Sequence, residues 1–363
     1  MRLFQNAGIY PAYLPRLNQL AHGASTFARR LEVFLADRYG ASHILKPVYE
    51  ADASVFFTNA DDQVLQQLWA REHGMPAGSK PPAILLAQIE HHRAEVFYNM
   101  DPMRYGSDFV RRLPGCVKHA IAWRAAPSAG ADFSAYQLIV CNFPGILQSY
   151  ADRGWRGGYL SPSHDPEMDA YAANTARPVD ILFVGGYSRH HRRRAEILEA
   201  VVASCKDLKV VFHLDRSRLT RLAESIPGRL LPLEKHRRPA DIRAVSAAPI
   251  FGRQLYAALS AAKIVLNGAV DMAGEDRGNM RCFEAMGCGA LMVSDKGNYP
   301  AGMVDGETMR LYSGVSDVVA VLRQALAVDA SGVALARNGH ARVRDLYSKS
   351  NQWAVFKQLV GGL

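Results

Sequence analysis

The segment from Gly278 to Asp295 constrains the fold more than any other part of the chain. It predicts a polar loop, a short helix, a glycine turn and a buried strand in immediate succession. Asn279 is suited to cap this helix, and Gly287 and Gly289 can end it and turn the backbone into the strand. A helix that leads directly into a buried strand is typical of an α/β protein with a parallel sheet.

The start of this predicted helix is also a candidate ligand site. Its free backbone N–H groups and the positive end of its dipole favour an anion such as a diphosphate. Glu284 follows about one turn later, and a carboxylate there can accept two hydrogen bonds from a ribose diol. Arg281, one turn before Glu284, can orient that carboxylate or contact the diphosphate itself.

The same residues resemble the nucleotide-sugar site of GT-B glycosyltransferases, in which the pattern E-A-M-x-C-G-x-x-V-V-x-S recurs. The wording N-M-R-C-F-E-A-M-G-C-G-A is most similar to the spore-maturation-type (CgeB-like) branch of that superfamily. The resemblance implies that Glu284 holds the ribose and that Asn279, Met280 and Arg281 lie at the donor. Many members carry E-x7-E, with the first Glu near the sugar. Asp276 stands at that position here, and we expect it to lie near the donor sugar.

The order of predicted elements indicates two domains, as 363 residues allow. Strands and helices alternate up to Cys141, with a helix from Ser25 to Tyr39 that Ser25 is expected to cap. The polar, proline-punctuated stretch 161–178 predicts a linker, and a second alternating series starts at Val179. It includes helices at 192–204, 252–262 and 315–327, and a last helix near 348–359 after the stretch 339–347.

The predicted fold class is therefore α/β, and the resemblance implies the GT-B architecture of two Rossmann-like doubly wound domains facing across a cleft. Residues 1–160 would form an acceptor-binding domain and residues 161–178 the linker. Residues 179–345 would bind the nucleotide sugar. The resemblance implies that a C-terminal helix within 346–363 packs back on the first domain.

Three further segments contain candidates for donor binding. Gly185 and Gly186 end a buried strand, where glycines let the backbone approach a phosphate, although a plain strand–turn has the same pattern. Cationic residues then fill positions 189–194 at a helix start, where the dipole disfavours them unless an anion binds. We predict that Arg192 or Arg194 contacts the diphosphate; a solvated helix face is the alternative. Asn267, at a strand end, can bind ligand or cap the next turn.

Two residues are candidates for catalysis. Asp101 follows a strand of the first domain and can act as general base towards an acceptor hydroxyl if burial raises its pKa, although Asp-Pro is also a common turn starter. His164, near the domain junction, is the second candidate. The sequence shows neither H-E-x-x-H nor a D-x-D motif at a strand end. We therefore expect no metal cofactor, with the helix dipole and arginine stabilising the leaving diphosphate.

Charge and cysteine content suggest partners and compartment. The net charge of +9 favours acidic partners: a nucleotide-sugar donor, a lipid-linked acceptor alongside saccharide ones, or an anionic membrane surface. The arginines are dispersed and no nucleic-acid-binding signature occurs, so we expect no nucleic acid. Five cysteines without a C-x-x-C pair indicate neither disulfides nor zinc. No apolar run reaches the ~18 residues of a membrane span. We expect the reducing cytoplasm, and contact with the inner membrane face is compatible with the charge.

The leading hypothesis is a metal-independent hexosyl- or deoxyhexosyltransferase. It would move a sugar from a nucleoside-diphosphate sugar, such as a UDP-sugar, to an acceptor hydroxyl in cell-surface polysaccharide or glycoconjugate synthesis. Two alternatives remain open from the sequence: a nucleotide-sugar 2-epimerase of the same fold, and a non-catalytic protein that binds a phosphorylated ligand.

Overall fold

The computed structural model describes residues 1–187, 192–268, 273–327 and 331–363, which form two compact units. Unit 1 consists of the described residues of Met1–Ser163, Met272–Asp276 and Tyr347–Leu363. Unit 2 consists of those of His164–Asp271 and Arg277–Leu346. Positions 189–191 of the cationic run lie outside the described residues.

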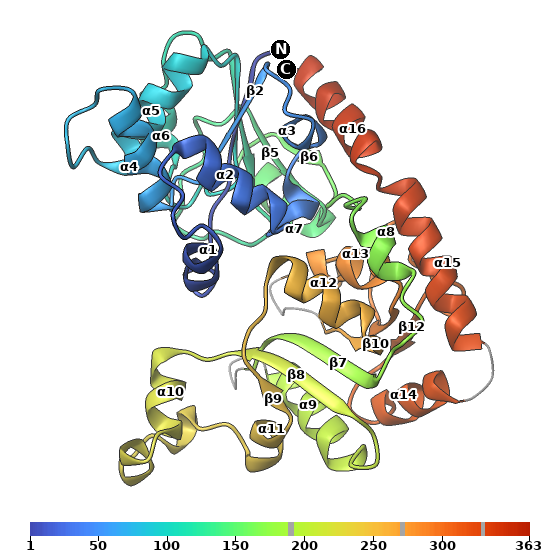
Figure 1. The fold of residues 1–363 in the computed structure, drawn as a ribbon. Coiled ribbons are helices and arrows are strands. Elements are labelled where there is room, and N and C mark those ends of the chain that lie inside the picture. Colours follow the sequence, from blue (N-terminus) through green and yellow to red (C-terminus); the bar gives the residue numbers. More distant parts are fainter. Residues whose placement is uncertain (188–191, 269–272, 328–330) are drawn as a thin grey trace. The chain divides into compact units, whose positions relative to one another are not determined.

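Unit 1 is built on a parallel sheet of six strands in the order β2-β1-β3-β4-β5-β6 (Figure 1). Its strands are β1 (Leu3–Asn6), β2 (Val55–Thr58), β3 (Val96–Asn99), β4 (His119–Trp123), β5 (Leu138–Cys141) and β6 (Gly157–Tyr159). Its helices are α1 (Leu14–Leu20), α2 (Phe27–Ala36), η1 (Ala41–His43), α3 (Lys46–Tyr49), α4 (Gln63–Glu72), α5 (Pro81–His92), α6 (Ser107–Val110), α7 (Pro144–Ala151) and α16 (Lys349–Gly361). The strand order reverses at β1 and β3, which is where doubly wound sheets bind ligands.

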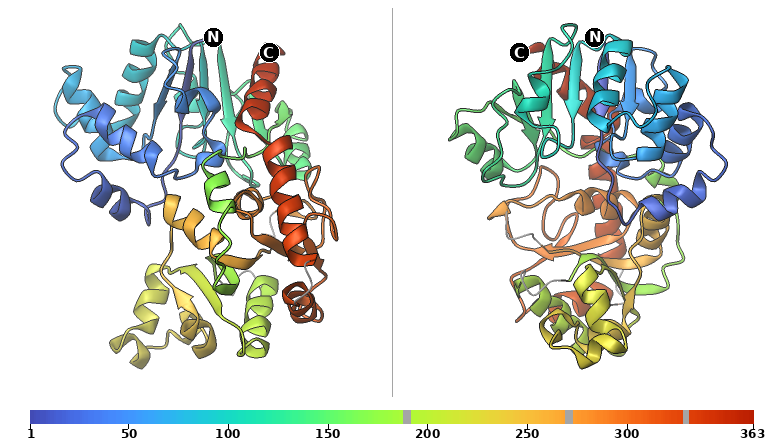
Figure 2. Two further views of the ribbon diagram at one scale, coloured as in Figure 1. Left: turned by 45° about the vertical axis from the view of Figure 1, so that its right-hand side comes forward. Right: turned by 90° about the vertical axis from the view of Figure 1, so that its left-hand side faces the viewer.

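The strands of unit 1 are apolar on both faces because helices cover both (Figures 1 and 2). Phe4 and Phe97 face one buried cluster, and their neighbours Leu3 and Tyr98 face the other. Helix α16 closes the second face: the ring of Phe356 lies 4.9 Å from that of Tyr98. The last helix of the chain is thus part of unit 1.

Two helix starts in unit 1 show how local sequence chemistry sets the boundaries. The Thr26 hydroxyl, not that of Ser25, caps α2 by accepting the Arg29 amide at 3.2 Å. The predicted cap was therefore wrong by one residue. Asp62 caps α4 by accepting the Val64 and Leu65 amides.

Unit 2 contains a second parallel sheet, in the order β12-β11-β10-β7-β8-β9. Its strands are β7 (Val179–Gly186), β8 (Val210–Asp215), β9 (Ser246–Ala247), β10 (Ala262–Leu266), β11 (Leu291–Asp295) and β12 (Arg310–Tyr312). Its helices are α8 (Met168–Ala172), α9 (Arg192–Ser204), α10 (Arg218–Glu224), η2 (Pro227–Leu230), η3 (Glu234–His236), α11 (Ala240–Ala244), α12 (Gly252–Ser260), α13 (Met280–Gly287), α14 (Val318–Leu326) and α15 (Ser331–Leu346). This is the strand order of dinucleotide-binding folds, with its reversal at β7 and β10.

Two helices of unit 2 differ from the sequence predictions. The predicted linker contains α8, which packs against α13 so closely that a Cβ on Gly287 would lie 2.4 Å from the Met168 Sδ. Helix α15 runs through Gly339, in a stretch not predicted to be helical. A Cβ on Gly339 would lie 2.6 Å from the Thr308 carbonyl oxygen. Both glycines permit close packing, which the sequence alone does not distinguish from a helix break.

Within the described ranges no single helix is long and apolar enough to cross a membrane; α14 and α15 reach that length only as a pair bent by 97°.

Candidate functional site

In unit 2, several predicted ligand residues lie where the strand order reverses. Gly185 and Gly186 end β7, and Asn267 follows the last residue of β10 directly. Because β7 and β10 are parallel neighbours, these positions share one edge of the sheet. A Cβ on Gly185 would lie 3.0 Å from the Phe183 ring, whereas one on Gly186 would meet no described atom within 4 Å. The backbone at Gly186 is therefore open to a ligand.

Helix α13 begins at the same edge and ends as the sequence predicted. Gly289 adopts φ +72°, its amide donates to the Met286 carbonyl, and the Ala290 amide donates to the Ala285 carbonyl. This pair of bonds is the Schellman ending, which satisfies the last carbonyls and turns the chain into β11. Met280 is the first residue of the helix and is partly exposed.

Asn279 occupies the N-cap position of α13, but its side chain does not cap the helix. Its Nδ2 instead donates to the Asn267 Oδ1 at 3.2 Å. The prediction of side-chain capping was therefore wrong: the Asn279 Oδ1, the atom that would cap, accepts from the Cys282 thiol at 3.6 Å and not from a helix amide. The first turn of α13 thus has no side-chain acceptor from its N-cap, which suits an anion there.

Asn267 joins three elements rather than facing solvent. Its Nδ2 donates to the Ser294 Oγ at 3.0 Å, and its main-chain carbonyl accepts the Tyr312 hydroxyl at 2.7 Å. Its own amide donates to the Val293 carbonyl at 2.8 Å. With its oxygen held by Asn279, this buried side chain positions the start of α13 against β11 and β12. A direct ligand contact, as predicted, would require breaking these bonds.

Glu284 and Arg281 form an ion pair on α13. Arg281 Nη1 lies 2.5 Å from Glu284 Oε2, and the Glu284 side chain is 3% exposed. Burial raises the pKa of Glu284, and the adjacent guanidinium opposes that rise. Among the described residues, Arg281 is the one that donates a hydrogen bond to this carboxylate, and it donates to Oε2. Oε1 therefore remains for a ligand hydroxyl. The predicted orientation of Glu284 by Arg281 is present in the structure.

The two arginines proposed as diphosphate contacts differ in their placement. Arg192 is the exposed first residue of α9. Arg194 is partly buried, and its Nη2 donates to the Gly268 carbonyl at 2.9 Å, beside Asn267. Arg194 therefore connects α9 to the end of β10 at the switch point and is the better placed of the two for an anion there.

Asp276 belongs to unit 1, whereas Glu284 belongs to unit 2. The Asp276 Oδ2 accepts the amide of Gly145 at 2.6 Å, in the first turn of α7. This carboxylate thus stabilises the start of a helix in the structure. Its predicted place near the donor sugar stays a prediction.

Asp101 lies at the switch point of unit 1, just beyond β3. Its amide donates to the Asn99 Oδ1 at 3.1 Å, and Arg104 Nε lies 3.6 Å from its Oδ2. Burial raises the pKa of the Asp101 carboxyl group. Arg104 also pairs with Asp61, the residue before the cap of α4. A Cβ on Gly8 would lie within 4 Å of both acids, so the two carboxylates flank the loop after β1.

His164 has the surroundings of a packing residue. It is 2% exposed, and its Nε2 lies 2.9 Å from the Asp169 Oδ1. A Cβ on Gly287, the last residue of α13, would lie 3.1 Å from its Nδ1. Burial lowers the pKa of His164. Because α13 rises about 1.5 Å per residue, His164 lies at the opposite end of that helix from Asn279. This geometry does not support its predicted catalytic role.

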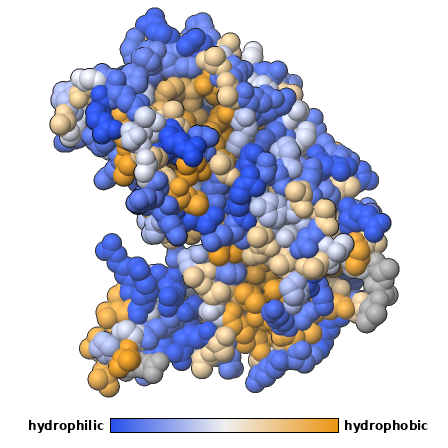
Figure 3. Space-filling model, in the orientation of Figure 1, coloured by the Kyte–Doolittle hydropathy of each residue, from blue (hydrophilic) through white to orange (hydrophobic). Residues whose placement is uncertain are grey.

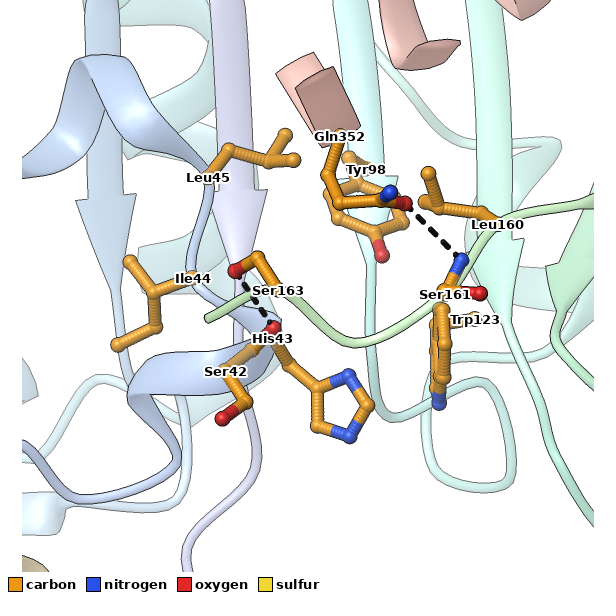
Figure 4. A pocket seen from close by; sticks show the side chains of 10 residues that line it. All are labelled: Ser42, His43, Ile44, Leu45, Tyr98, Trp123, Leu160, Ser161, Ser163 and Gln352. Atoms are coloured by element: carbon orange, nitrogen blue, oxygen red, sulfur yellow. Dashed lines mark hydrogen bonds between the residues drawn. The ribbon is translucent and has the colours of Figure 1, made fainter. Parts of the chain in front are cut away.

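A small cavity in unit 1 is too small to hold a sugar. It has a volume of about 10 Å³ and lies between η1, the ends of β3 and β4, and α16 (Figure 4). Gln352 accepts the Ser161 amide at its rim, and Ser163 donates to the Ser42 carbonyl. This volume fits about one water molecule and excludes a sugar ring.

The sequence analysis overlooked the ion pair of Arg277 and Asp295. Their Nε–Oδ2 distance is 2.9 Å and both side chains are at most 5% exposed. The Arg277 amide also donates to the Asn298 carbonyl. The pair fixes the loop before α13 to the end of β11. The sequence signals that could have revealed it are an arginine directly before the segment Gly278–Asp295 and the aspartate that ends this segment. In the described ranges, no group of three or more His, Cys, Asp or Glu side chains is arranged to hold a metal ion.

Comparison with known proteins places this architecture. Residues 192–358 match the family model described as glycosyl transferase-like. A search of curated proteins gave no match. HepE from Anabaena, solved with UDP and glucose, is 12% identical, with 100% of both chains covered and a TM-score of 0.58.

Two further solved structures agree with this fold. Sucrose-phosphate synthase from Thermosynechococcus elongatus is 15% identical over 77% of this chain and 76% of its own, with a TM-score of 0.51. TarM from S. aureus is 11% identical over 77% of this chain and 59% of its own, with a TM-score of 0.53. The two doubly wound units are therefore those of the GT-B fold, as predicted. The CgeB-like branch stays a prediction.

Proposed function

We propose that this chain, a GT-B-fold protein whose C-terminal half is a glycosyl transferase-like domain, transfers a sugar from a nucleoside-diphosphate sugar to an acceptor hydroxyl. The family match and the similarity to HepE, solved with UDP and glucose, support a transferase. They favour it over the 2-epimerase and the non-catalytic binding protein. Synthesis of a cell-surface polysaccharide or glycoconjugate is the proposed setting.

The observation that carries this proposal is the arrangement around α13 in unit 2. The helix presents an anion-favouring first turn at the switch-point edge, with Glu284 buried about one turn further along. We assign the diphosphate to the amides of that turn, with Arg281 and Arg194 beside it. The ribose diol would donate to the Glu284 carboxylate.

The chemistry then requires charge stabilisation and proton transfer. As the bond from the sugar C1 to the diphosphate oxygen breaks, negative charge grows on the diphosphate. The positive end of α13 and the arginines stabilise it, so we propose that no metal cofactor is needed. We assign the acceptor, saccharide or lipid-linked, to unit 1. Its hydroxyl oxygen bonds to C1 and its proton passes to Asp101, whose raised pKa suits a base.

We further propose that the protein works in the reducing cytoplasm, at or near the inner membrane surface. The five cysteines are all free thiols. The net charge of +9 favours anionic partners, among them phosphorylated donors and acidic lipids.

A thermal-shift panel with UDP, GDP, dTDP, CMP and their sugars tests the proposal. We expect one nucleoside diphosphate to raise the melting temperature in proportion to the logarithm of its concentration above Kd. Turnover of the donor only when an acceptor is present would separate a transferase from an epimerase. A panel without any shift would contradict the assignment of the donor site.

A further inference from the structure

One surface of unit 2 gathers exposed apolar side chains. The chain between β8 and α11 forms α10 and η2, and these project from the unit (Figure 1). Fifteen large apolar side chains are exposed in the described residues, and five of them fall within positions 219–231. They are Leu219, Leu222, Ile226, Leu230 and Leu231, and two of them are more than 80% exposed. The clustering is unusual, because exposed apolar residues are normally scattered singly.

The segment that carries these exposed apolar side chains is held in place by a buried ion pair. Leu219 and Leu222 are three residues apart on α10, so they share one side of that helix, and the exposed Ile226 follows after the extended residue Ser225. On the inner side, Arg238 donates to both oxygens of Glu224 at 2.6 and 2.8 Å, and this pair is 7% exposed on each side chain. The segment is thus anchored through its polar residues and directs its leucines outward.

The segment that carries this apolar face is also cationic. Residues 216–238 contain seven arginines and lysines and two acidic residues. The segment therefore carries +5 of the chain's net charge of +9. Arg216, Arg218 and Arg221 are exposed in the same segment as the leucines; Glu224 pairs with Arg238 and also lies 3.8 Å from Arg216. Figure 3 shows the result at lower left: apolar side chains on α10 and η2 next to strongly hydrophilic ones.

We propose that this surface, which we call the α10–η2 face, docks on an anionic lipid membrane; this inference rests on the proposed location at the inner membrane surface and assigns the contact to a defined part of unit 2. Leucine and isoleucine side chains enter the boundary between headgroups and acyl chains, while arginines beside them pair with acidic headgroups. Exposed arginines in the same segment as exposed leucines complement a layer of acidic headgroups above acyl chains, and this complementarity favours the lipid surface. Binding of a nucleic acid would leave the five apolar side chains without an apolar partner.

Vesicle co-sedimentation of the full chain tests this proposal directly. We expect binding to vesicles of phosphatidylcholine with phosphatidylglycerol, and much weaker binding to phosphatidylcholine alone. Replacing both Arg218 and Arg221 by Gln should weaken binding to the anionic vesicles by roughly fivefold per arginine, following about 1 kcal/mol for each cation near the surface. The triple variant Leu222→Ser, Ile226→Ser and Leu230→Ser should weaken binding to both vesicle types by at least about tenfold.

Matched controls separate the α10–η2 face from general effects of charge and hydrophobicity. Val333→Ser on α15 and Arg29→Gln on α2 remove similarly exposed side chains elsewhere and should leave vesicle binding unchanged. Circular dichroism and thermal melts establish that each variant folds. The proposal is overturned if the wild type ignores anionic vesicles, or if the α10–η2 variants bind as well as the controls. Sedimentation velocity tests the alternative that a second copy of the chain covers this face. The proposal is also overturned if the wild type is a dimer that does not bind vesicles and the triple variant is a monomer.

Discussion

A substitution at Gly186 can test whether a ligand lies close to this residue without disturbing the fold. The residue ends β7 at the switch point, is exposed, and does not adopt a positive φ. A Cβ built there meets no described atom within 4 Å. Gly186→Val should therefore fold normally and gain up to about 1 kcal/mol, because valine loses less backbone entropy than glycine and prefers strands.

The same substitution should damage nucleotide binding. If a phosphate approaches the backbone at Gly186, the isopropyl group takes its place. We expect UDP, or the nucleotide that the panel identifies, to bind at least about tenfold more weakly, which corresponds to about 1.4 kcal/mol. Titration calorimetry gives the affinity, and urea denaturation gives the free energy of unfolding.

Gly314 is the matched control for this experiment. It also belongs to unit 2, and a Cβ there likewise meets no described atom within 4 Å. Gly314→Val should leave nucleotide affinity unchanged. Unaltered affinity in Gly186→Val, with stability retained, would refute the placement of the diphosphate at the end of β7.

Three further predictions follow from the geometry. Gly287→Ala should lower the free energy of unfolding by about 1–3 kcal/mol in urea denaturation, because its Cβ would lie 2.4 Å from the Met168 Sδ; full stability would refute the tight contact of α8 with α13. Burial raises the pKa of Asp101, so its stabilising contribution is present at low pH and is lost as pH rises through that pKa. Asp101→Asn should therefore keep its stability at pH 7, lower kcat by roughly 10²–10⁴ and abolish the acid limb of the kcat profile; an unchanged kcat would place the base elsewhere. Asn267→Ala removes the side-chain bonds to Asn279 and Ser294 and should cost about 2–4 kcal/mol, with weaker nucleotide binding as α13 loosens; a thermal melt identical to that of the wild type would show that Asn267 does not position the helix.

The sequence predicted the elements whose periodicity and end signals agree. Helix α9 has the predicted bounds of Arg192–Ser204, since four apolar positions at helical spacing fix one buried face. Helix α13 and strand β11 followed from the two glycines that end the helix. Most of the stretch between Cys205 and Gly252 was left unassigned. Its helices are short, and α10 directs its leucines outward, so no inward-facing periodicity marks it.

The candidate site was predictable in its location but less so in its contacts. A glycine turn at a strand end and a helix start after a strand place ligand residues at one sheet edge by topology alone. Which neighbour a side chain chooses depends on tertiary packing. Asn279 bonds to Asn267 instead of capping α13, and Asp276 bonds to Gly145 in unit 1. Such long-range partners leave no signal in local spacing.

The central claim is that α13 binds the nucleoside diphosphate of the donor and that Glu284 holds its ribose. The most direct measurement is titration calorimetry of that nucleotide with the wild type, with Glu284→Ala, and with Glu307→Ala, an exposed glutamate of the same unit. Loss of two hydrogen bonds to a charged carboxylate should weaken binding by about 100-fold in Glu284→Ala. Glu307→Ala should bind like the wild type. Equal affinity in all three folded proteins would contradict the account.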